Sequence, residues 1–421
     1  MLKKYLASDF IRNILTLMTG AVIAQAIPFL ASPLLTRLYT PTDFGIFALY
    51  TAIVGTAVVV SSLRYELAIM LPKEQHDARS LTFLSGLLTF GMALLSFVLI
   101  LIFKNYLIEK VNSDLSFFIW IVPVGLLFSG LYQIMNSFST RNKFFKSTSA
   151  GKITQSGAII GSQIGLKLLS FSSIGLIVGK VIGDFLAFLY LFILNIRKNT
   201  LTFATITRQN IIENAGKYKD FPKYQALSAF LNQLAQNLPA LLLTFFYAPQ
   251  IAGFYALTTR ILSAPIRLIG MSTREVYYQK ASEMHARGEN IFRLYLKTTL
   301  GLAKIGIIPF ILFGIFATYV FTWVFGDEWY TSGIYARIIV AWSFFLFINS
   351  PTTTTIYILN LQRFGLKFES VSLSLRAFSL FAGYYFFDSD YLSVGFYALA
   401  GILLNLFLIL YIYKKLKKRS R

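Results

Sequence analysis

The sequence predicts an all-α integral membrane protein with twelve transmembrane helices in two parallel lobes of six. Apolar residues make up 56% of the 421 residues and charged residues only 14%, whereas a soluble domain carries about 25% charged residues. Mean hydropathy is +0.63. A water-soluble chain cannot bury this much apolar surface, so we expect a lipid environment, where helices satisfy their own backbone groups.

An internal repeat predicts a duplicated architecture. Residues 30–49, LASPLLTRLYTPTDFGIFAL, align without gaps with residues 238–257, LPALLLTFFYAPQIAGFYAL, at an offset of 208 positions. In each copy one apolar run ends, a Tyr-x-Pro turn follows and a second apolar run begins, which is typical of a helical hairpin at a membrane surface. Nine of the twenty aligned pairs are identical, among them Tyr39/Tyr247, Pro41/Pro249 and Gly45/Gly253.

Twelve apolar segments can cross about 30 Å of hydrocarbon as helices, the fifth only marginally. The first has no convincing cleavage site, so we expect a retained span and not a signal peptide. In chain order the segments cover residues 14–36, 44–63, 81–103, 115–138, 151–169, 174–196, 222–246, 250–273, 299–323, 333–360, 366–387 and 392–413.

The distribution of Lys and Arg predicts which loops are cytoplasmic. Loops and termini on one side of the twelve-span arrangement carry 29 basic residues, those on the other side carry 4, and 6 lie within spans. Because cytoplasmic loops are rich in Lys and Arg, both termini are expected in the cytoplasm. Most of the net charge of +21 then reflects topology and attraction to anionic membrane lipids. We therefore expect no nucleic-acid partner.

An even number of spans in each half makes the two lobes parallel repeats, because both enter the membrane from the same side. We predict an N-lobe at residues 1–196, a polar cytoplasmic linker at 197–221, and a C-lobe at 222–421 with a basic cytoplasmic tail. The segment 275–297, which mixes charges and aromatic rings, is expected to lie as an amphipathic helix at the membrane interface.

Six basic side chains fall within spans, where charges are costly and usually face water or a partner. A single clear acid, Asp184, cannot neutralise six cations, so we expect an anionic ligand or water to compensate. For two of them, Lys304 and Arg337, there is an alternative. They lie near the ends of their spans, so their charged groups could extend to the membrane interface. The six are Lys180, Arg260, Arg267, Lys304, Arg337 and Arg376.

The eighth span carries a ladder of arginines. Arg260, Arg267 and Arg274 are spaced by seven, which on an α-helix returns the side chain to within about 20°. The guanidinium fork fits phosphate oxygens bidentately, so these three, with Lys180 and Arg376, are candidate ligands for an anionic substrate. A voltage sensor also presents such a ladder, but it would not explain the duplicated frame.

The seventh span carries a stripe of amides at helical spacing. Asn232, Gln233 and Gln236 belong to it, and Gln25 is the repeat partner of Gln233. These four are candidate sugar contacts, because amides suit sugar hydroxyls. Amides suit hydrogen bonds between helices equally well, and the sequence leaves both interpretations open.

Lys180 and Asp184 are four residues apart and can pair along one helix. One interpretation is a self-neutralised pair. The other makes Asp184 a coupling carboxylate for a proton or a sodium ion.

A catalytic constellation is missing from the sequence. There is no Ser-His-Asp or Cys-His arrangement, no phosphate-cradling Gly loop and no cluster of metal ligands. The chain has two histidines and no cysteine. We expect no enzymatic activity, no metal site and no cofactor.

Three motifs carry a resemblance to a known family. LLTRLYTPTDFGIFALY at 34–50 and RYELAIMLPKEQHDA at 64–78 resemble the N-terminal signature of Wzx-type polysaccharide flippases. YALTTRILSAPIRLIG at 255–270 is also similar to that family. These flippases belong to the multidrug/oligosaccharidyl-lipid/polysaccharide exporter (MOP) superfamily.

The resemblance implies two six-helix lobes around a central cationic cavity, and alternating access. The implied substrate is an undecaprenyl-diphosphate-linked oligosaccharide repeat unit, moved across the bacterial cytoplasmic membrane for O-antigen, capsule or exopolysaccharide synthesis. The glycan polymerase machinery is an implied partner.

Two rival functions remain. A small-molecule exporter of the same superfamily would favour acidic cavity residues, the opposite of the charge seen here. Membrane-embedded glycan polymerases resemble one another in having a large extracytoplasmic loop, whereas the extracytoplasmic loops predicted for this chain are all short.

Overall fold

The computed structural model describes residues 9–110, 116–202, 206–359 and 361–419, and over these ranges it is helical almost throughout, with no strand. Large apolar side chains lie exposed along the helices, for example Phe90 at 57% and Ile308 at 63% exposure. Such surfaces require lipid, so the chain is an all-α integral membrane protein, as its composition predicted. Each predicted segment coincides with a helix or helix pair. Within the described ranges, eight helical segments are long and apolar enough to cross a membrane, and the count of twelve crossings stays a prediction.

The chain divides into two compact units. Unit 1 comprises residues 1–39 and 46–238. Its helices are α2 (Asp9–Leu30), α3 (Ser32–Leu38), α4 (Pro41–Ser61, from Ile46 on), α5 (Tyr65–Ala68), α6 (Gln75–Lys110), α7 (Ser116–Arg141), α8 (Phe145–Leu168), α9 (Ser173–Arg197), α10 (Arg208–Lys217), the π-helix η2 (Phe221–Ala226) and the first part of α11 (Leu227–Phe246).

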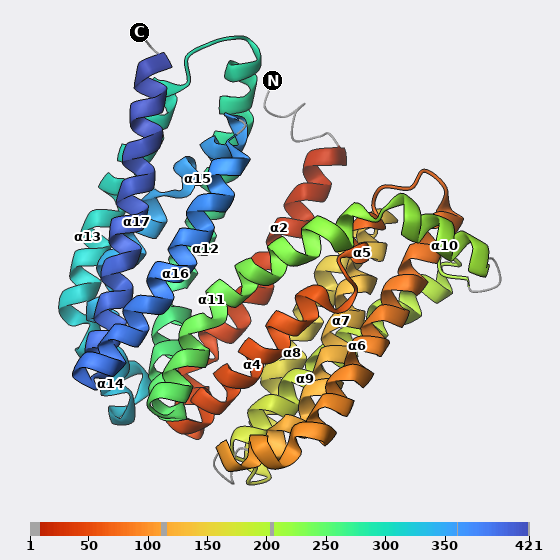
Figure 1. The fold of residues 1–421 in the computed structure, drawn as a ribbon, viewed down its shortest axis with the longest axis horizontal. Helices are drawn as coiled ribbons and strands as arrows, with labels where there is room; N and C mark the ends of the chain where they lie inside the picture. The colour runs from red at the N-terminus through yellow and green to blue at the C-terminus, as the bar shows by residue number, and fades with distance from the viewer. Residues whose placement is uncertain (1–8, 111–115, 203–205, 360, 420–421) are drawn as a thin grey trace. The chain divides into compact units, whose positions relative to one another are not determined.

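Within unit 1 the helices α6, α7, α9 and α8 pack in succession, and α2 packs on α8 (Figure 1). Glycines let α9 approach α8 closely. A Cβ atom on Gly183 would lie 2.2 Å from Ile159 Cγ1, and one on Gly179 would lie 2.6 Å from Gln163 Cγ. This close packing determines which side chains surround the middle of α9.

The predicted linker at 197–221 is packed onto unit 1. Its helix α10 lies against α6. Asn214 Nδ2 donates to Asp77 Oδ1 at 3.0 Å, and the Tyr65 hydroxyl donates to the Ala215 carbonyl at 2.9 Å. By contacts unit 1 therefore includes the linker and continues to Leu238. The division into lobes at 196 and 222 stays a prediction.

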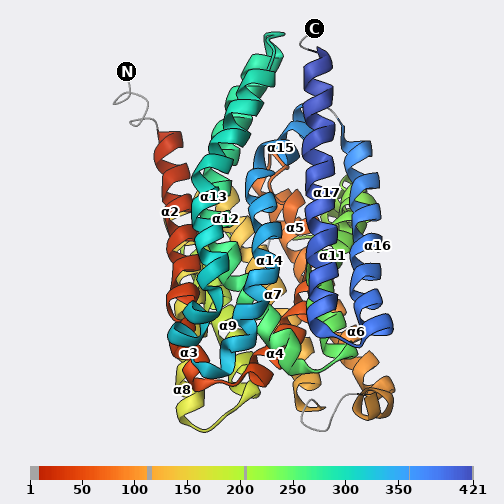
Figure 2. The ribbon, with the colours of Figure 1, turned by 90° about the vertical axis from the view of Figure 1, so that its left-hand side faces the viewer.

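Unit 2 comprises residues 40–45 and 239–421. In it α13 packs on α14, α16 packs on α17, and both α12 and α17 contact α14 (Figure 2). Its helices are the end of α11, α12 (Pro249–Ala286), α13 (Phe292–Phe325), the 3₁₀ turn η3 (Asp327–Trp329), α14 (Tyr330–Ile348), α15 (Ser350–Ile358), α16 (Gln362–Phe387) and α17 (Asp390–Arg419).

The prediction of one amphipathic helix over 275–297 is wrong. This segment is the end of α12, a turn and the start of α13. Two of the aromatic rings that suggested an interfacial helix are buried inside the protein. Tyr277 and Tyr295 are buried, at 2% and 1% exposure, in a core cluster with residues of α15 and α17. The Tyr277 hydroxyl lies 2.7 Å from Thr355 Oγ1, and that of Tyr295 donates to the Ile409 carbonyl at 3.2 Å.

The two copies of the repeat have matching local structure. In each copy a tyrosine hydroxyl binds a neighbouring helix and a proline starts the next helix, Pro41 in α4 and Pro249 in α12. The Tyr39 hydroxyl donates to the Gln163 carbonyl of α8 at 2.7 Å. The Tyr247 hydroxyl is hydrogen-bonded to Ser393 Oγ of α17, also at 2.7 Å.

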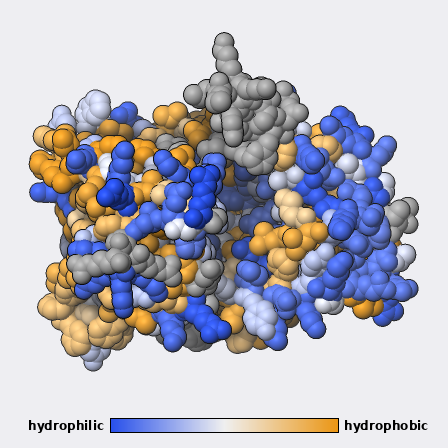
Figure 3. Space-filling model, turned by 90° about the horizontal axis from the view of Figure 1, so that it is seen from above, coloured by the Kyte–Doolittle hydropathy of each residue, from blue (hydrophilic) through white to orange (hydrophobic). Residues whose placement is uncertain are grey.

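Each unit exposes basic side chains near the ends of helices. Figure 3 shows one face of the molecule, on which hydrophilic and hydrophobic residues are both exposed. In unit 1, α10 exposes Arg208 and Lys217, and in unit 2 the last turns of α12 and α17 expose Lys280 and Lys414. These side chains are suited to water and lipid headgroups, not to hydrocarbon.

Candidate functional site

Asp184 lies at the centre of a buried polar cluster in unit 1. The residue is 0% exposed. Gln155 Nε2 of α8 donates to its Oδ1 atom at 2.7 Å. Its Oδ2 atom accepts from the Ser129 hydroxyl of α7 and from Lys180 Nζ, with which it forms an ion pair. Three donors on three helices therefore hold the carboxyl group in place.

Two tyrosine hydroxyls lie near this carboxylate. Tyr50 of α4 and Tyr132 of α7 are 1% and 8% exposed, and both interact electrostatically with Asp184. Neither hydroxyl has a hydrogen-bond partner within the described ranges. Buried polar groups are normally satisfied, so these two hydroxyls are available to a small ligand or water beside the carboxylate.

The predicted Lys180–Asp184 contact is present, but the pair is not isolated. Lys180 keeps 27% of its side chain exposed, while Asp184 keeps 1%. Sequence reasoning missed Gln155 and Ser129. For Gln155 the signal was the polar composition of the fifth predicted span, 151–169, which forms most of α8.

The candidate sugar-contact amides occupy different settings. Gln25 is exposed on α2, Asn232 and Gln236 are exposed on α11, and Gln233 is half-buried. Gln236 Nε2 donates to Asn232 Oδ1 at 2.6 Å, so these two form a pair on the helix surface. Their contact with a sugar stays a prediction.

Asn237, which follows Gln236 on the seventh predicted span, joins two helices. Asn237 Nδ2 donates to the Ala52 carbonyl at 3.1 Å and to Thr56 Oγ1 at 3.0 Å. Both acceptors are in the part of α4 that belongs to unit 1, as Asn237 does. At this position the amide makes a helix–helix hydrogen bond, one of the two roles that the sequence left open.

The arginine ladder lies on one unbroken helix. Arg260, Arg267 and Arg274 all belong to α12, so their seven-residue spacing places them on one face. Arg260 is half-buried, while Arg267 and Arg274 are exposed. Arg267 Nη2 donates to Ser263 Oγ at 2.7 Å, and Arg260 lies close enough to Arg267 for their charges to interact. Two like charges in apolar surroundings favour an anion between or beside them.

Arg376 of α16 has aromatic neighbours that the sequence did not reveal. Its guanidinium carbon lies 5.5 Å from the ring centroid of Trp342 and 5.9 Å from that of Tyr397. Such cation–π contacts stabilise a desolvated cation. The buried Arg376 Nε and Trp342 Nε1 atoms have no hydrogen-bond partner in the described residues. Both N–H groups are therefore available to donate to an acceptor on a ligand.

These features define a class of protein. The two helical units have the fold of the MOP superfamily of transporters. The lipid II flippase MurJ, in an inward closed conformation, aligns with a TM-score of 0.71 and 14% identity over 96% of this chain and 89% of that chain. An inward-facing multidrug resistance MATE family transporter of this superfamily aligns with a TM-score of 0.68 and 14% identity over 96% of both chains.

A third solved structure is a MOP superfamily transporter from Pyrococcus furiosus. It is described as having a binding pocket of reversed polarity that suggests a different function. It aligns with a TM-score of 0.61 and 14% identity over 99% of this chain and 98% of that chain.

The chain belongs to the polysaccharide biosynthesis protein family, which matches residues 34–333. This membership confirms the resemblance to polysaccharide flippases that the N-terminal and C-terminal motifs suggested. No curated protein matches the sequence.

Proposed function

We propose that this protein is a flippase that moves an undecaprenyl-diphosphate-linked oligosaccharide repeat unit across the bacterial cytoplasmic membrane by alternating access. The product would serve surface polysaccharide synthesis, such as O-antigen, capsule or exopolysaccharide. The observation that carries the proposal is the arginine ladder on α12, in a membrane protein of the polysaccharide biosynthesis family. The likeness to the lipid II flippase supports a lipid-linked substrate.

In this proposal residues 1–196 and 222–421 act as parallel lobes and both termini lie in the cytoplasm. Arg260, about 17 Å along α12 from Pro249 at 1.5 Å per residue, binds the diphosphate near the bilayer centre. There a guanidinium replaces the water that the diphosphate sheds. Arg267 and Arg274 attract the headgroup from the cytoplasmic side. Lys180 and Arg376 add positive charge, and the exposed amides contact the sugars.

Ion coupling is assigned to Asp184. Its carboxylate is buried, multiply hydrogen-bonded and close to two free tyrosine hydroxyls. A proton or sodium ion arriving there would compete with Lys180 for the carboxylate. This competition offers a physical link between ion binding and the packing of α7, α8 and α9.

The rival function is export of a small molecule, which the likeness to MATE transporters favours. A cationic drug would be repelled by Arg260 and Arg267, whereas an anionic lipid headgroup would be attracted. Neither function requires an enzyme.

The test is complementation of a strain that lacks the native gene. Arg260→Ala should abolish most surface polysaccharide and cause lipid-linked oligosaccharide to accumulate, at matched membrane abundance. Arg260→Lys should retain part of the activity, because the charge remains while the bidentate fork is lost. Lys280→Ala, an exposed cation on the same helix, is the control and should complement fully. Full complementation by Arg260→Ala would remove Arg260 from the mechanism.

A further inference from the structure

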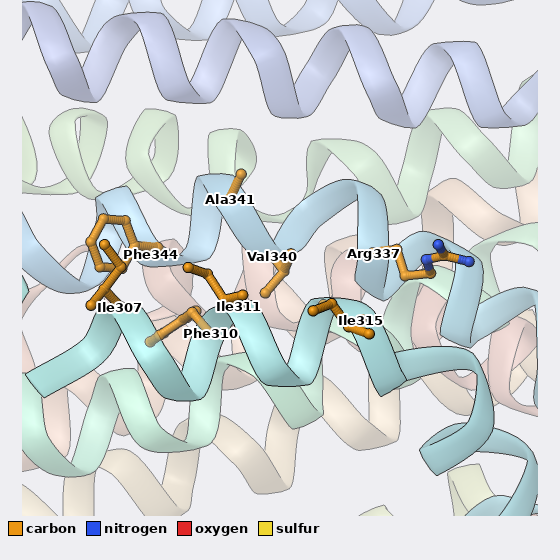
Figure 4. A pocket seen from close by; sticks show the side chains of 9 residues that line it. Ile307, Phe310, Ile311, Ile315, Arg337, Val340, Ala341 and Phe344 are labelled. Carbon is orange, nitrogen blue, oxygen red and sulfur yellow. The ribbon is translucent and has the colours of Figure 1, made fainter.

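A groove lies along unit 2 between α13 and α14, with a volume of about 390 Å³ (Figure 4). Its walls are apolar, and the side chains that line it include Ile307, Ile311 and Ile315 of α13 and Val340, Ala341 and Phe344 of α14. The three isoleucines are 46%, 54% and 59% exposed. Both helices are candidate membrane spans, so this groove opens toward hydrocarbon.

A close approach of the two helices forms the floor of the groove. Gly314 faces α14, and a Cβ atom on it would lie 3.1 Å from Val340 Cγ1. The missing side chain lets α13 approach α14 closely at this point, and the groove runs over this contact. From Ile307 to Ile315 the groove runs for about 12 Å at 1.5 Å per residue, a length that fits several methylene groups of an extended alkyl chain.

The groove ends at a single cation. Figure 4 shows Arg337 at the end nearest Ile315, with its guanidinium directed away from the apolar walls. Across the described parts of the chain no acidic side chain forms an ion pair with it, and no hydrogen bond satisfies it. An unpaired cation next to an apolar groove is complementary to an amphiphile with a negative headgroup.

The depth of Arg337 fits a lipid phosphate. Arg337 is seven residues, about 10 Å, into α14 from Tyr330. The exposed rings of Tyr319, Trp323 and Tyr330, at 69%, 73% and 54% exposure, surround the same end of the helix pair. Tyr and Trp gather at the membrane–water boundary. A guanidinium that reaches outward from this depth therefore arrives at the level of the headgroups.

We propose that the α13–α14 groove binds one anionic phospholipid of the surrounding bilayer. Its phosphate pairs with Arg337, and one acyl chain lies along Ile307, Ile311 and Ile315. The lipid comes from the leaflet on the side of the η3 turn. This site lies outside the arginine ladder of α12, and it does not depend on the transported substrate.

Native mass spectrometry of the detergent-purified full chain tests this proposal. Added phosphatidylglycerol should give a one-lipid adduct that survives higher collision energy than the phosphatidylcholine adduct. Arg337→Gln should lower the bound phosphatidylglycerol fraction at least fivefold. Ala341→Phe, which fills the groove and keeps the cation, should lower it as well.

Lys304→Gln is the matched control, because Lys304 is an exposed cation on α13 that does not line the groove. It should bind phosphatidylglycerol like the wild type. Equal binding by wild type and Arg337→Gln, or equal binding of the two phospholipids, would overturn the proposal. Preferential binding of undecaprenyl phosphate at this groove, lost in Ala341→Phe, would assign the site to the substrate lipid and would equally overturn it.

Discussion

Gly45 and Gly253, which are 208 positions apart and equivalent in the internal repeat, lie against each other in unit 2 where α4 and α12 begin. A Cβ atom on Gly45 would be 1.6 Å from the Pro249 carbonyl oxygen, and one on Gly253 would be 1.9 Å from the Pro41 carbonyl oxygen. The contact is thus reciprocal, with each glycine facing the proline of the other copy. The repeat preserves glycine here because backbone atoms occupy the space that a side chain would need.

Gly45→Ala should therefore destabilise the protein. Backbone cannot move aside as a flexible side chain can, so we expect a loss of about 1–3 kcal/mol, seen as a lower apparent melting temperature in detergent. Gly86→Ala is the control, because nothing lies within 4 Å of a Cβ atom on Gly86. In a helix this change is neutral or favourable by up to about 1 kcal/mol. Equal melting temperatures for both variants would contradict the close contact.

Asp184→Asn should destabilise unit 1 by about 3–5 kcal/mol, because it leaves the Lys180 ammonium without its charge partner. The double variant Lys180→Met with Asp184→Leu removes both charges and should recover part of that stability, because Gln155 and Ser129 are still left without their acceptor. Thermal unfolding of the three proteins measures this. If Asp184 also couples ions, the double variant should fold and still fail to transport. A stable Asp184→Asn protein would show that the ion pair contributes little.

Asn237→Ala should loosen the packing of α11 on α4, because it removes the hydrogen bonds to Ala52 and Thr56. Hydrogen bonds between membrane helices contribute about 0.6 kcal/mol each on average, so we expect a loss of about 1 kcal/mol. Asn232→Ala is the comparison, since Asn232 is exposed and bonded only along its own helix by Gln236. Equal thermal stability of the two variants would show that the hydrogen bonds from Asn237 to α4 do not stabilise the packing of the two helices.

Tyr277→Phe should weaken the packed ends of α12 and α13. Burial raises the pKa of Tyr277 to about 12. Thr355 Oγ1 donates to the Pro351 carbonyl, so the Tyr277 hydroxyl is the donor to Thr355. Losing this bond costs about 1 kcal/mol and should speed proteolysis at the 287–291 turn.

Tyr278→Phe is the control for this prediction, because the Tyr278 ring is 50% exposed. It should leave the proteolysis rate at the 287–291 turn unchanged.

The stabilising effect of the Tyr277 hydroxyl should depend on pH only above the neutral range. The raised pKa keeps this hydroxyl protonated in the folded protein, and its contribution to stability is lost only as pH rises above the pKa of an unfolded tyrosine, about 10. The difference between wild type and Tyr277→Phe should hence stay constant between about pH 6 and about pH 9. A difference that vanishes within that range would mean that the hydroxyl ionises there.

The sequence by itself determined that this is a helical membrane protein, where its helical segments lie and that it contains an internal repeat. These depend on hydrophobicity along one helix and on local turn residues, and lipid leaves helices as the simplest way to satisfy the backbone. The seven-residue arginine ladder was equally readable, because Arg260, Arg267 and Arg274 lie on one continuous helix. The amphipathic helix expected at 275–297 was wrong, because the chain turns at 287–291 and Tyr277 and Tyr295 pack against helices that are distant in the chain.

Only the tertiary structure decided what surrounds each charge. Gln155 and Ser129 reach Asp184 from positions 29 and 55 residues away in the chain, and the rings beside Arg376 come from α14 and α17. No local pattern encodes such contacts, since they arise when helices cross at glycines such as Gly183. The groove that ends at Arg337 has the same origin, because its two walls belong to different helices.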